Sequence, residues 1–102
     1  MQISICYAGN WRVLPSTKTL ITIGRPNNEV SVDLDLSPDT TVSRLHAKAY
    51  ESNGAIWIED LKSKYGTLLN GTKITQPTSI QSGDTITIGE TLLRIDLQPN
   101  KK

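Results

Sequence analysis

Apolar and polar residues alternate along much of this chain. Successive side chains of a β-strand point to opposite faces, so a period of two gives one face to a core and the other to water. The runs that alternate are residues 3–7, 30–36, 56–59, 85–88 and 93–97. No segment has the apolar period of a long amphipathic helix. The pattern therefore predicts an all-β protein.

Short turn signals separate these runs. Asn53-Gly54 and Asn70-Gly71 are strong hairpin signals, since both residue types tolerate the positive φ of a tight turn. Further turns are indicated at residues 8–10, 25–28 and 82–84. Many short strands joined by frequent turns are typical of a β-sandwich or barrel. Residues 37–43 are polar, contain a proline and do not alternate, so they are predicted to form a loop.

The length and composition bound the core. With 102 residues the chain has room for one domain, which we expect at 1–97, followed by a tail or linker at 98–102. The chain has no Phe, so Ile, Leu and Val are predicted to fill most of the core, with Trp11 and Trp57 as its two large side chains. Cys6 lies on an alternating run and is expected to be a buried thiol. A lone cysteine without a signal peptide favours a reducing, cytoplasmic location.

Several classes of function conflict with the composition. A net charge of +1 with interleaved signs argues against nucleic acid as the main partner, because backbone phosphates are bound by a clustered basic excess. No apolar run approaches the ~20 residues of a membrane helix. One His and one Cys are too few for a structural zinc site, and no metal or cofactor is expected. No catalytic residues are predicted either, because Ser43 and His46 are three residues apart at the start of a strand and face opposite sides, and no orienting acid is identifiable.

Three motifs follow one another along the chain. Gly-Arg at 24–25 comes directly after the apolar run 20–23, and Ser-Arg-Leu-His at 43–46 begins the strand after the polar loop. The third motif is Glu-Asp-Leu-Lys-Ser-Lys-Tyr-Gly-Thr-Leu-Leu-Asn-Gly at 59–71, with Gly-Asp at 83–84 and Ile-Gly at 88–89 further on. In order and spacing this set resembles the forkhead-associated (FHA) family over about residues 20–95. The resemblance implies a Greek-key β-sandwich of about eleven strands, with peptide-binding loops at one end.

The resemblance also implies recognition of a phosphothreonine peptide. A phosphothreonine carries a charge of about −1.5 to −2 and three acceptor oxygens, so it needs a fixed cation and several donors. Arg25 is expected to be the principal phosphate contact, because its guanidinium fork matches phosphate oxygens and keeps its charge. Ser43 is expected to donate its hydroxyl, and its backbone N–H is a further candidate donor. Two roles are possible for Lys64: it adds a second positive charge near the phosphate, or it is a solvated loop lysine. Two are also possible for Arg44, which either contacts the phosphate or peptide or faces water.

Other positions that match the family are expected to support the site. Gly24 would hold the turn that presents Arg25, and Gly66 and Gly71 the later turns. His46 is expected to be structural and to hydrogen-bond within the scaffold of the binding loops. Among the residues assigned to the peptide site, Thr67 is favoured as architectural, while Asn70 is open between bracing the loops and contacting the main chain of the peptide.

Tyr65 is the clearest departure from the family. The family usually has Asn before this Gly-Thr pair, and that amide often hydrogen-bonds the backbone of the bound peptide. A phenol cannot replace the paired donor and acceptor of an amide. Tyr65 is kept in the expected peptide site, but it favours a second hypothesis, in which the domain is a phosphorylation-independent scaffold.

The preferred hypothesis is a phosphothreonine-binding module. It would mediate phosphorylation-dependent protein–protein interaction in signal transduction, as part of a larger protein. A phosphothreonine-containing protein is the expected partner, and neither nucleic acid nor a membrane is expected to take its place. The isolated domain is expected to be a monomer.

Overall fold

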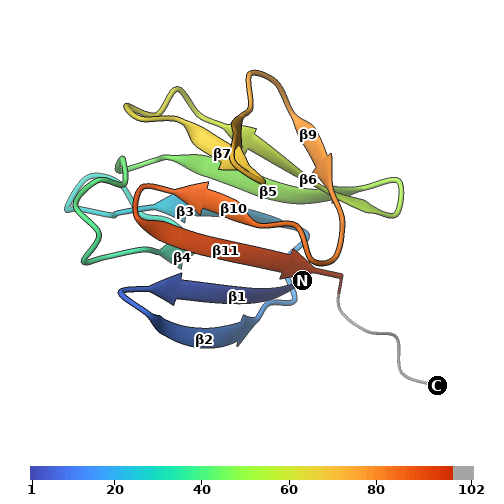
Figure 1. Ribbon diagram of the computed structural model, residues 1–102. Helices are drawn as coiled ribbons and strands as arrows, with labels where there is room; N and C mark the ends of the chain where they lie inside the picture. The colour runs from blue at the N-terminus through green and yellow to red at the C-terminus, as the bar shows by residue number, and fades with distance from the viewer. Residues whose placement is uncertain (98–102) are drawn as a thin grey trace.

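The structure is a computed structural model that describes residues 1–97. It consists of eleven strands in two sheets, and no helix occurs among these residues (Figure 1). The strands are β1 (Gln2–Tyr7), β2 (Asn10–Pro15), β3 (Leu20–Gly24), β4 (Leu34–Asp35), β5 (Ala47–Ser52), β6 (Ala55–Asp60), β7 (Thr67–Leu69), β8 (Thr72–Lys73), β9 (Thr78–Ile80), β10 (Ile86–Ile88) and β11 (Thr91–Asp96). The all-β sandwich that the alternation predicted is confirmed. The tail expected at 98–102 lies outside the described residues.

The two sheets contain six and five strands. The larger sheet has the order β2-β1-β11-β10-β7-β8, and the smaller has the order β4-β3-β5-β6-β9. All neighbouring strands pair antiparallel except β3 and β4, which are parallel. Nothing in residues 1–97 forms a helix long and apolar enough to cross a membrane. The same residues contain no cluster of three or more His, Cys, Asp or Glu side chains that could hold a metal ion.

The core lies between the sheets and is built from inward-facing residues of the strands other than β2 and β8. Aliphatic side chains dominate it, among them Ile3, Ile23, Ile58, Ile88 and Leu93. All of these positions except Ile23 belong to an alternating run, and Ile23 belongs to the apolar run 20–23, which is why the sequence predicted the core well. The free thiol of Cys6 is buried, as expected.

The prediction that Trp11 lies in the core is wrong. Trp11 is 49% exposed because it lies on β2, the outermost strand of its sheet, and points to the outer face. Its polar surroundings include the guanidinium of Arg94, whose central carbon lies 5.1 Å from the centre of the indole ring. Trp57, the other large side chain predicted for the core, is also not part of it: it is half-buried, and its Nε1–H donates to the carbonyl of Ser52 at 3.3 Å.

The alternating run 30–36 forms less strand than predicted. Only Leu34 and Asp35 pair, with Ile23 and Gly24 of β3. Before this pair the chain forms a turn, in which the side-chain oxygen of Asn27 accepts the N–H groups of Glu29 at 3.0 Å and Val30 at 2.8 Å. Leu34 and Leu36 are nevertheless buried, so the alternation marked the core correctly while local hydrogen bonds shortened the strand.

The loops of the sandwich gather at two ends. The β3–β4, β4–β5, β6–β7 and β10–β11 connections lie at the left-hand end in Figure 1, and the N-terminus lies at the other. Residues 37–43, predicted to be a loop, fall within the β4–β5 connection. The first end, called the loop end below, therefore brings together segments that are far apart in the sequence.

Candidate functional site

The end of β3 and the start of β5 meet at Gly24. The N–H of Arg25 donates to the carbonyl of Ser43 at 3.0 Å, and the N–H of His46 donates to the carbonyl of Ile23 at 2.8 Å. A Cβ atom on Gly24 would lie 2.1 Å from the carbonyl oxygen of Arg44. Only glycine permits so close an approach of two main chains. The contact places Arg25 beside Ser43.

The guanidinium of Arg25 is held at one nitrogen. Its Nε–H donates to the carbonyl of Val42 at 3.2 Å, and the side chain is half-buried. Among residues 1–97 no carboxylate forms an ion pair with it. The outer N–H groups of the fork are therefore available to an anion, while the main chain fixes the direction of the fork.

His46 links two of the loops from within. The side chain is fully buried; its Nδ1 accepts the N–H of Ser43 at 3.0 Å, and its Nε2 lies 2.8 Å from the carbonyl of Gly66. Because Nδ1 accepts a hydrogen bond, Nε2 carries the proton and donates to that carbonyl. Both ring nitrogens are thus occupied, which leaves neither for a metal ion or for proton transfer.

Ser43 has one free donor. Its N–H is committed to His46, so the N–H that the sequence offered as a second phosphate donor is not available. Its hydroxyl oxygen accepts the N–H of Lys64 at 3.0 Å, which leaves the hydroxyl proton free. This bond brings the β6–β7 loop to the other two segments, so that Arg25, Ser43 and Lys64 are held in one place. We call these three residues the basic cluster.

The β6–β7 loop is shaped by Asp60, which the sequence analysis did not single out. One carboxylate oxygen accepts the hydroxyls of Ser63 at 2.6 Å and Thr67 at 2.7 Å, and the other accepts the N–H of Ser63 at 3.1 Å. The Ser63 hydroxyl in turn accepts the N–H of Gly66 at 2.8 Å. Burial raises the pKa of Asp60, but these hydrogen bonds outweigh it and hold the pKa below its ordinary value.

Thr67 and Asn70 brace the loops rather than face a ligand. Thr67 is fully buried and gives its hydroxyl to Asp60, so its assignment to the peptide site is corrected. Asn70 precedes the turn at Gly71. Its side-chain N–H donates to Asp84 at 3.1 Å, and its side-chain oxygen accepts the N–H of Thr85 at 2.9 Å. Both ends of its amide bond to residues before β10, which supports the bracing role, and the contact with the peptide stays a prediction.

Asp39 is a second carboxylate that the sequence analysis missed. Only 1% of it is exposed, and it accepts hydrogen bonds from the N–H and hydroxyl of Thr41, the N–H of Glu90 at 2.8 Å and the hydroxyl of Thr91 at 2.7 Å. Burial opposes its charge, yet these donors lower the pKa of Asp39. Asp39 therefore fastens the β4–β5 loop to the β10–β11 turn.

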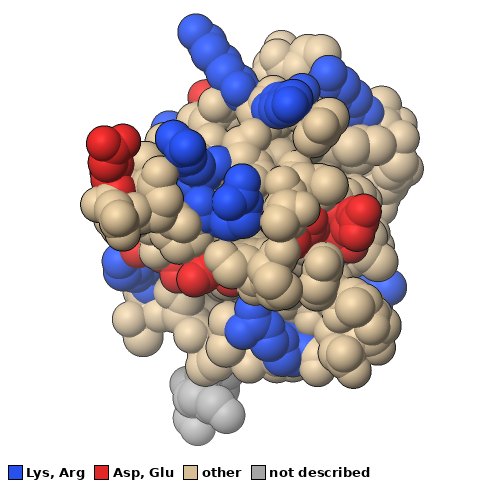
Figure 2. All heavy atoms as spheres, turned by 90° about the vertical axis from the view of Figure 1, so that its left-hand side faces the viewer, with Lys and Arg blue, Asp and Glu red and all other residues tan. Residues whose placement is uncertain are grey.

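A shallow apolar hollow of about 190 Å³ lies at the loop end. It is lined by Thr41, Tyr65, Gly89 and Glu90, which come from the β4–β5, β6–β7 and β10–β11 connections. Tyr65 is 58% exposed, and the Lys64 ammonium lies 5.4 Å from the centre of its ring. Seen from the loop end, Lys and Arg side chains gather over the upper half of the surface, with acidic side chains at its sides (Figure 2). The end thus offers cations next to an uncharged surface.

Residues 21–89 match the sequence profile of the FHA domain. This span contains every residue of the basic cluster and the residues that hold it. The chain belongs to the FHA domain family. It is 32% identical over 82 residues to Protein FraH of Nostoc sp. (strain PCC 7120), a match that covers 76% of this chain and 28% of that protein. The FHA domain thus spans under a third of the length of this curated relative.

Solved structures agree with the family assignment. The Slr1951 protein from Synechocystis sp. matches with a TM-score of 0.77 and 28% identity, over 96% of this FHA domain and 98% of that chain. The FhaA FHA domain complexed with the intracellular domain of Rv3910 matches with a TM-score of 0.75 and 26% identity, over 91% and 96% of the two chains. The fold of this chain is therefore that of known FHA domains.

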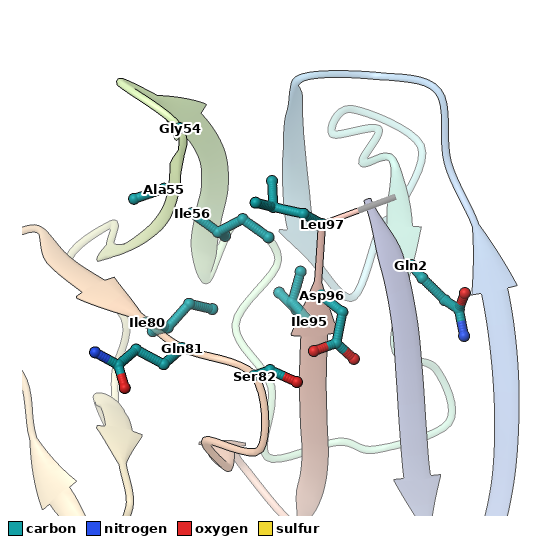
Figure 3. A pocket seen from close by; sticks show the side chains of 10 residues that line it. All are labelled: Gln2, Gly54, Ala55, Ile56, Ile80, Gln81, Ser82, Ile95, Asp96 and Leu97. Carbon is teal, nitrogen blue, oxygen red and sulfur yellow. The ribbon is translucent and has the colours of Figure 1, made fainter. Parts of the chain in front are cut away.

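A larger hollow of this FHA domain lies away from the basic cluster. It measures about 630 Å³ and opens between β6, β9 and β11 at the end where the N-terminus lies, with Ile56, Ile80 and Leu97 around it (Figure 3). One carboxylate oxygen of Asp96 beside it is buried without a hydrogen-bond partner among residues 1–97. No residue of the basic cluster lines this hollow.

Proposed function

We propose that this FHA domain binds a phosphothreonine in an extended segment of a partner protein and catalyses nothing itself. The observation that carries the proposal is the basic cluster. Arg25 is anchored through Nε to Val42, and the Ser43 hydroxyl, which keeps a free proton, binds the main chain of Lys64. Three loops thereby present one fixed cation, one mobile cation and one neutral donor to the same volume of solvent.

The phosphate chemistry fits these groups. A dianionic phosphate has more acceptor positions than one side chain can satisfy, so a guanidinium fork and a hydroxyl complement each other. Arg25 supplies two parallel N–H groups, and Ser43 supplies its hydroxyl. Losing one such charge-assisted hydrogen bond costs ~1.5–3 kcal/mol of binding free energy. Because the loops are already held by His46 and Asp60, little order has to be created when the ligand binds.

Lys64 and Arg44 add charge at the rim. Both side chains are exposed, and neither forms an ion pair within residues 1–97. An exposed lysine contributes mostly to the field that attracts the phosphate, since water screens it strongly. We assign Lys64 to the phosphate because its own N–H is bonded to Ser43, and Arg44 to the outer edge of the peptide.

The apolar hollow gives the site a preference beyond the phosphate. We infer that the wall formed by Thr41 and Tyr65 receives apolar atoms of the bound segment next to the phosphate. An extra methyl group in such a surface is worth ~1–3 kcal/mol, which is enough to favour phosphothreonine over phosphoserine. Tyr65 takes the place of the family's amide here and offers a ring face in its stead.

The proposed biological setting is a cytoplasmic signalling protein of which this FHA domain is one part. The relation to FraH, of which the matched region is 28%, supports a longer parent protein. A protein partner is supported by the FhaA FHA domain, which forms a complex with the intracellular domain of another protein.

A second candidate is a phosphorylation-independent scaffold. The exposed ring of Tyr65 and the hollow beside it favour this candidate, because they would bind an apolar segment without any phosphate. The two functions differ in whether phosphatase treatment of the partner abolishes the complex.

Peptide binding to the purified chain tests the proposal. Fluorescence anisotropy would compare a phosphothreonine peptide library with matched phosphoserine and unphosphorylated libraries. Binding is expected only for phosphothreonine, and the Arg25→Ala variant should bind at least ~100-fold more weakly, because its loss removes a bidentate contact with the phosphate. Arg94→Ala, which removes an exposed arginine on β11, is the matched control and should bind as the wild type does.

Two results would contradict the proposal. Retained affinity in a folded Arg25→Ala variant would show that the basic cluster is not the phosphate site. Equal binding of phosphorylated and unphosphorylated peptides by the wild type would favour the scaffold function. Circular dichroism of each variant shows whether the fold is intact.

A further inference from the structure

β2 is the long open edge of the described sandwich. Four strands lie at the edges of the two sheets, and three of them are short: β4 and β8 have two residues each and β9 has three. β2 has six residues, and all of them are exposed. Short edge strands, charges and prolines are the usual means of keeping a sheet edge from pairing with another chain. β2 carries only Arg12 and, at its end, Pro15.

The free main-chain groups of β2 are identified by its pairing with β1. The N-terminal nitrogen of Met1 donates to the carbonyl of Ser16 at 2.8 Å, and the N–H of Ser16 donates to the carbonyl of Met1 at 2.8 Å. Hydrogen-bonded and non-hydrogen-bonded pairs alternate along an antiparallel ladder. Counted from the bonded pair of Met1 and Ser16, the next bonded pairs are therefore Ile3 with Leu14 and Ile5 with Arg12. The N–H and C=O groups of Trp11 and Val13 therefore point away from β1, toward solvent.

The side chains at these two positions are apolar and uncovered. Trp11 is 49% exposed and Val13 is 54% exposed, and both point to the outer face of the larger sheet. An indole and a branched aliphatic group on one sheet face, with Arg94 over the indole, resemble the composition of protein interfaces more than that of ordinary surface strands. The same residues thus offer free hydrogen-bonding groups and apolar surface.

We propose that β2 pairs antiparallel with β2 of a second copy of this chain, around a two-fold axis beside Val13. Two registers would use the outward N–H groups of Trp11 and Val13. One sets Arg12 directly opposite Arg12 of the second copy, which places like charges together and is unfavourable. The other sets Val13 opposite Val13, Arg12 opposite Leu14, and Trp11 opposite Pro15. In this register the Val13 N–H groups donate to each other's carbonyls, and the Trp11 N–H donates to the carbonyl of Pro15. The missing N–H of Pro15 does not prevent that bond.

The sequence of β2 is therefore complementary to itself in one register. That self-complementarity is the reason to choose a second copy over an unrelated strand as the occupant of this edge. The pairing joins two larger sheets into one continuous sheet, and it replaces the monomer expected from the sequence by a symmetric dimer. None of the residues of the basic cluster lies on β2, so the dimer leaves the loop end uncovered.

Sedimentation equilibrium of the whole chain from micromolar to millimolar concentration tests the dimer. The wild type is expected to approach twice the mass of one chain as the concentration rises. Val13→Lys and Val13→Glu should each raise the dimer dissociation constant by at least ~10-fold, because each sets like charges opposite each other at the axis. Leu20→Lys, a lysine at an exposed apolar position on β3 in the other sheet, is the control and should leave the dissociation constant unchanged.

A mixture of the two variants tests the register. If position 13 faces itself, Val13→Lys and Val13→Glu should form a heterodimer at a concentration where each alone is monomeric. A wild type that stays monomeric throughout the range would overturn the proposal. A dimer that survives both substitutions, or variants that do not associate when mixed, would overturn it as well. Thermal unfolding by circular dichroism verifies that each variant is folded.

Discussion

Gly24 shows how one residue can decide the shape of the site. Every other glycine among the described residues has a positive φ, whereas Gly24 is required for lack of space. The atoms that an added Cβ would meet belong to the main chain of the β4–β5 loop, which cannot rotate aside as a side chain would. The same loop carries Ser43, so a change at Gly24 moves two ligand groups at once.

We predict that Gly24→Ala weakens both the fold and the site. Overpacking of this kind costs ~1–3 kcal/mol of the free energy of unfolding, measurable by urea denaturation. Phosphopeptide affinity should fall by more than ~10-fold, because the hydrogen bond between Arg25 and Ser43 is forced apart. Gly54→Ala is the control: its φ is +78° but no atom lies within 4 Å of the added Cβ, so stability should fall by ~1–2 kcal/mol with unchanged affinity. Equal affinities of the two variants would disprove this view of Gly24.

Residue types told more about the basic cluster than about its supports. The family motif and the chemistry of a guanidinium and a hydroxyl together predicted phosphate contacts for Arg25 and Ser43, and the structure brings these two residues together. Thr67 and Asn70 belong to the same motifs but are turned toward Asp60 and Asp84. Motif membership does not tell whether a polar side chain faces solvent or a neighbouring carboxylate, and that difference needs the fold.

At the scale of elements, two aspartates fasten the binding loops. Asp39 joins the β4–β5 loop to the β10–β11 turn, and Asp60 closes the β6–β7 loop on itself. The partners of Asp39 at the β10–β11 turn are 51 and 52 positions away, and no local pattern shows them. At Asp39 the Asp-x-Thr turn was the one signal available, because such side chains bind the main chain two residues on. The partners of Asp60 lie three and seven residues on, within the motif at 59–71.

We predict that acid loosens these loops through Asp39. Its pKa is lowered from the ordinary value of 3.8, so below about pH 4 the unfolded chain binds more protons than the folded one. The stability that the charged form contributes is therefore complete above that range and is lost as the pH falls through the lower, folded pKa. Urea midpoints at pH 5, 4 and 3 should fall steeply for the wild type.

The Asp39→Asn variant isolates this effect. Its free energy of unfolding at pH 7 should be lower by ~1–3 kcal/mol, because an amide N–H₂ replaces a buried carboxylate oxygen that accepts N–H and O–H groups. Its stability should also fall less steeply below pH 4. Glu29→Gln, at an exposed position, should follow the wild type throughout. An acid response in Asp39→Asn as steep as in the wild type would assign the effect to other carboxylates.

Strands were predicted better than their edges. The alternation identified the inward residues of β1, β10 and β11 because burial on one face imposes a period of two. Composition put Trp11 in the core, because a chain without Phe has few other large apolar side chains, but composition does not show whether a second layer covers a residue. Whether a strand is central or at an edge depends on pairing between distant segments, which is why the exposure of Trp11 could not be predicted.

At the scale of the molecule, charge is distributed unevenly although it nearly cancels in sum. The formal net charge is +1, yet Arg25, Arg44, Lys62 and Lys64 all belong to the connections of the loop end. A nearly neutral chain can therefore attract an anion to one end. The net charge therefore argued against nucleic acid as the main partner, but it could not reveal a basic cluster at one end of the molecule.

We predict that salt weakens phosphopeptide binding and that Lys64 accounts for part of the effect. Raising the ionic strength from about 0.05 to 0.5 M shortens the screening length to under ~5 Å, so the dissociation constant should rise ~3- to 10-fold. Lys64→Gln should bind more weakly at low salt and respond less to added salt. Lys18→Gln, in the β2–β3 connection at the opposite end of the sandwich, serves as the control. A Lys64→Gln variant with the salt response of the wild type would remove Lys64 from the phosphate site.

The two ends of the sandwich differ in a way that has a practical use. Met1 and Leu97, the last described residue, both lie at the end opposite the loops (Figure 1). A bead, a chip surface or a fluorescent protein attached after Leu97 would therefore be held at the far side of the fold from Arg25. A domain immobilised this way would point its recognition surface into solution, as an antibody does on an affinity resin, and could enrich phosphothreonine peptides from a digest.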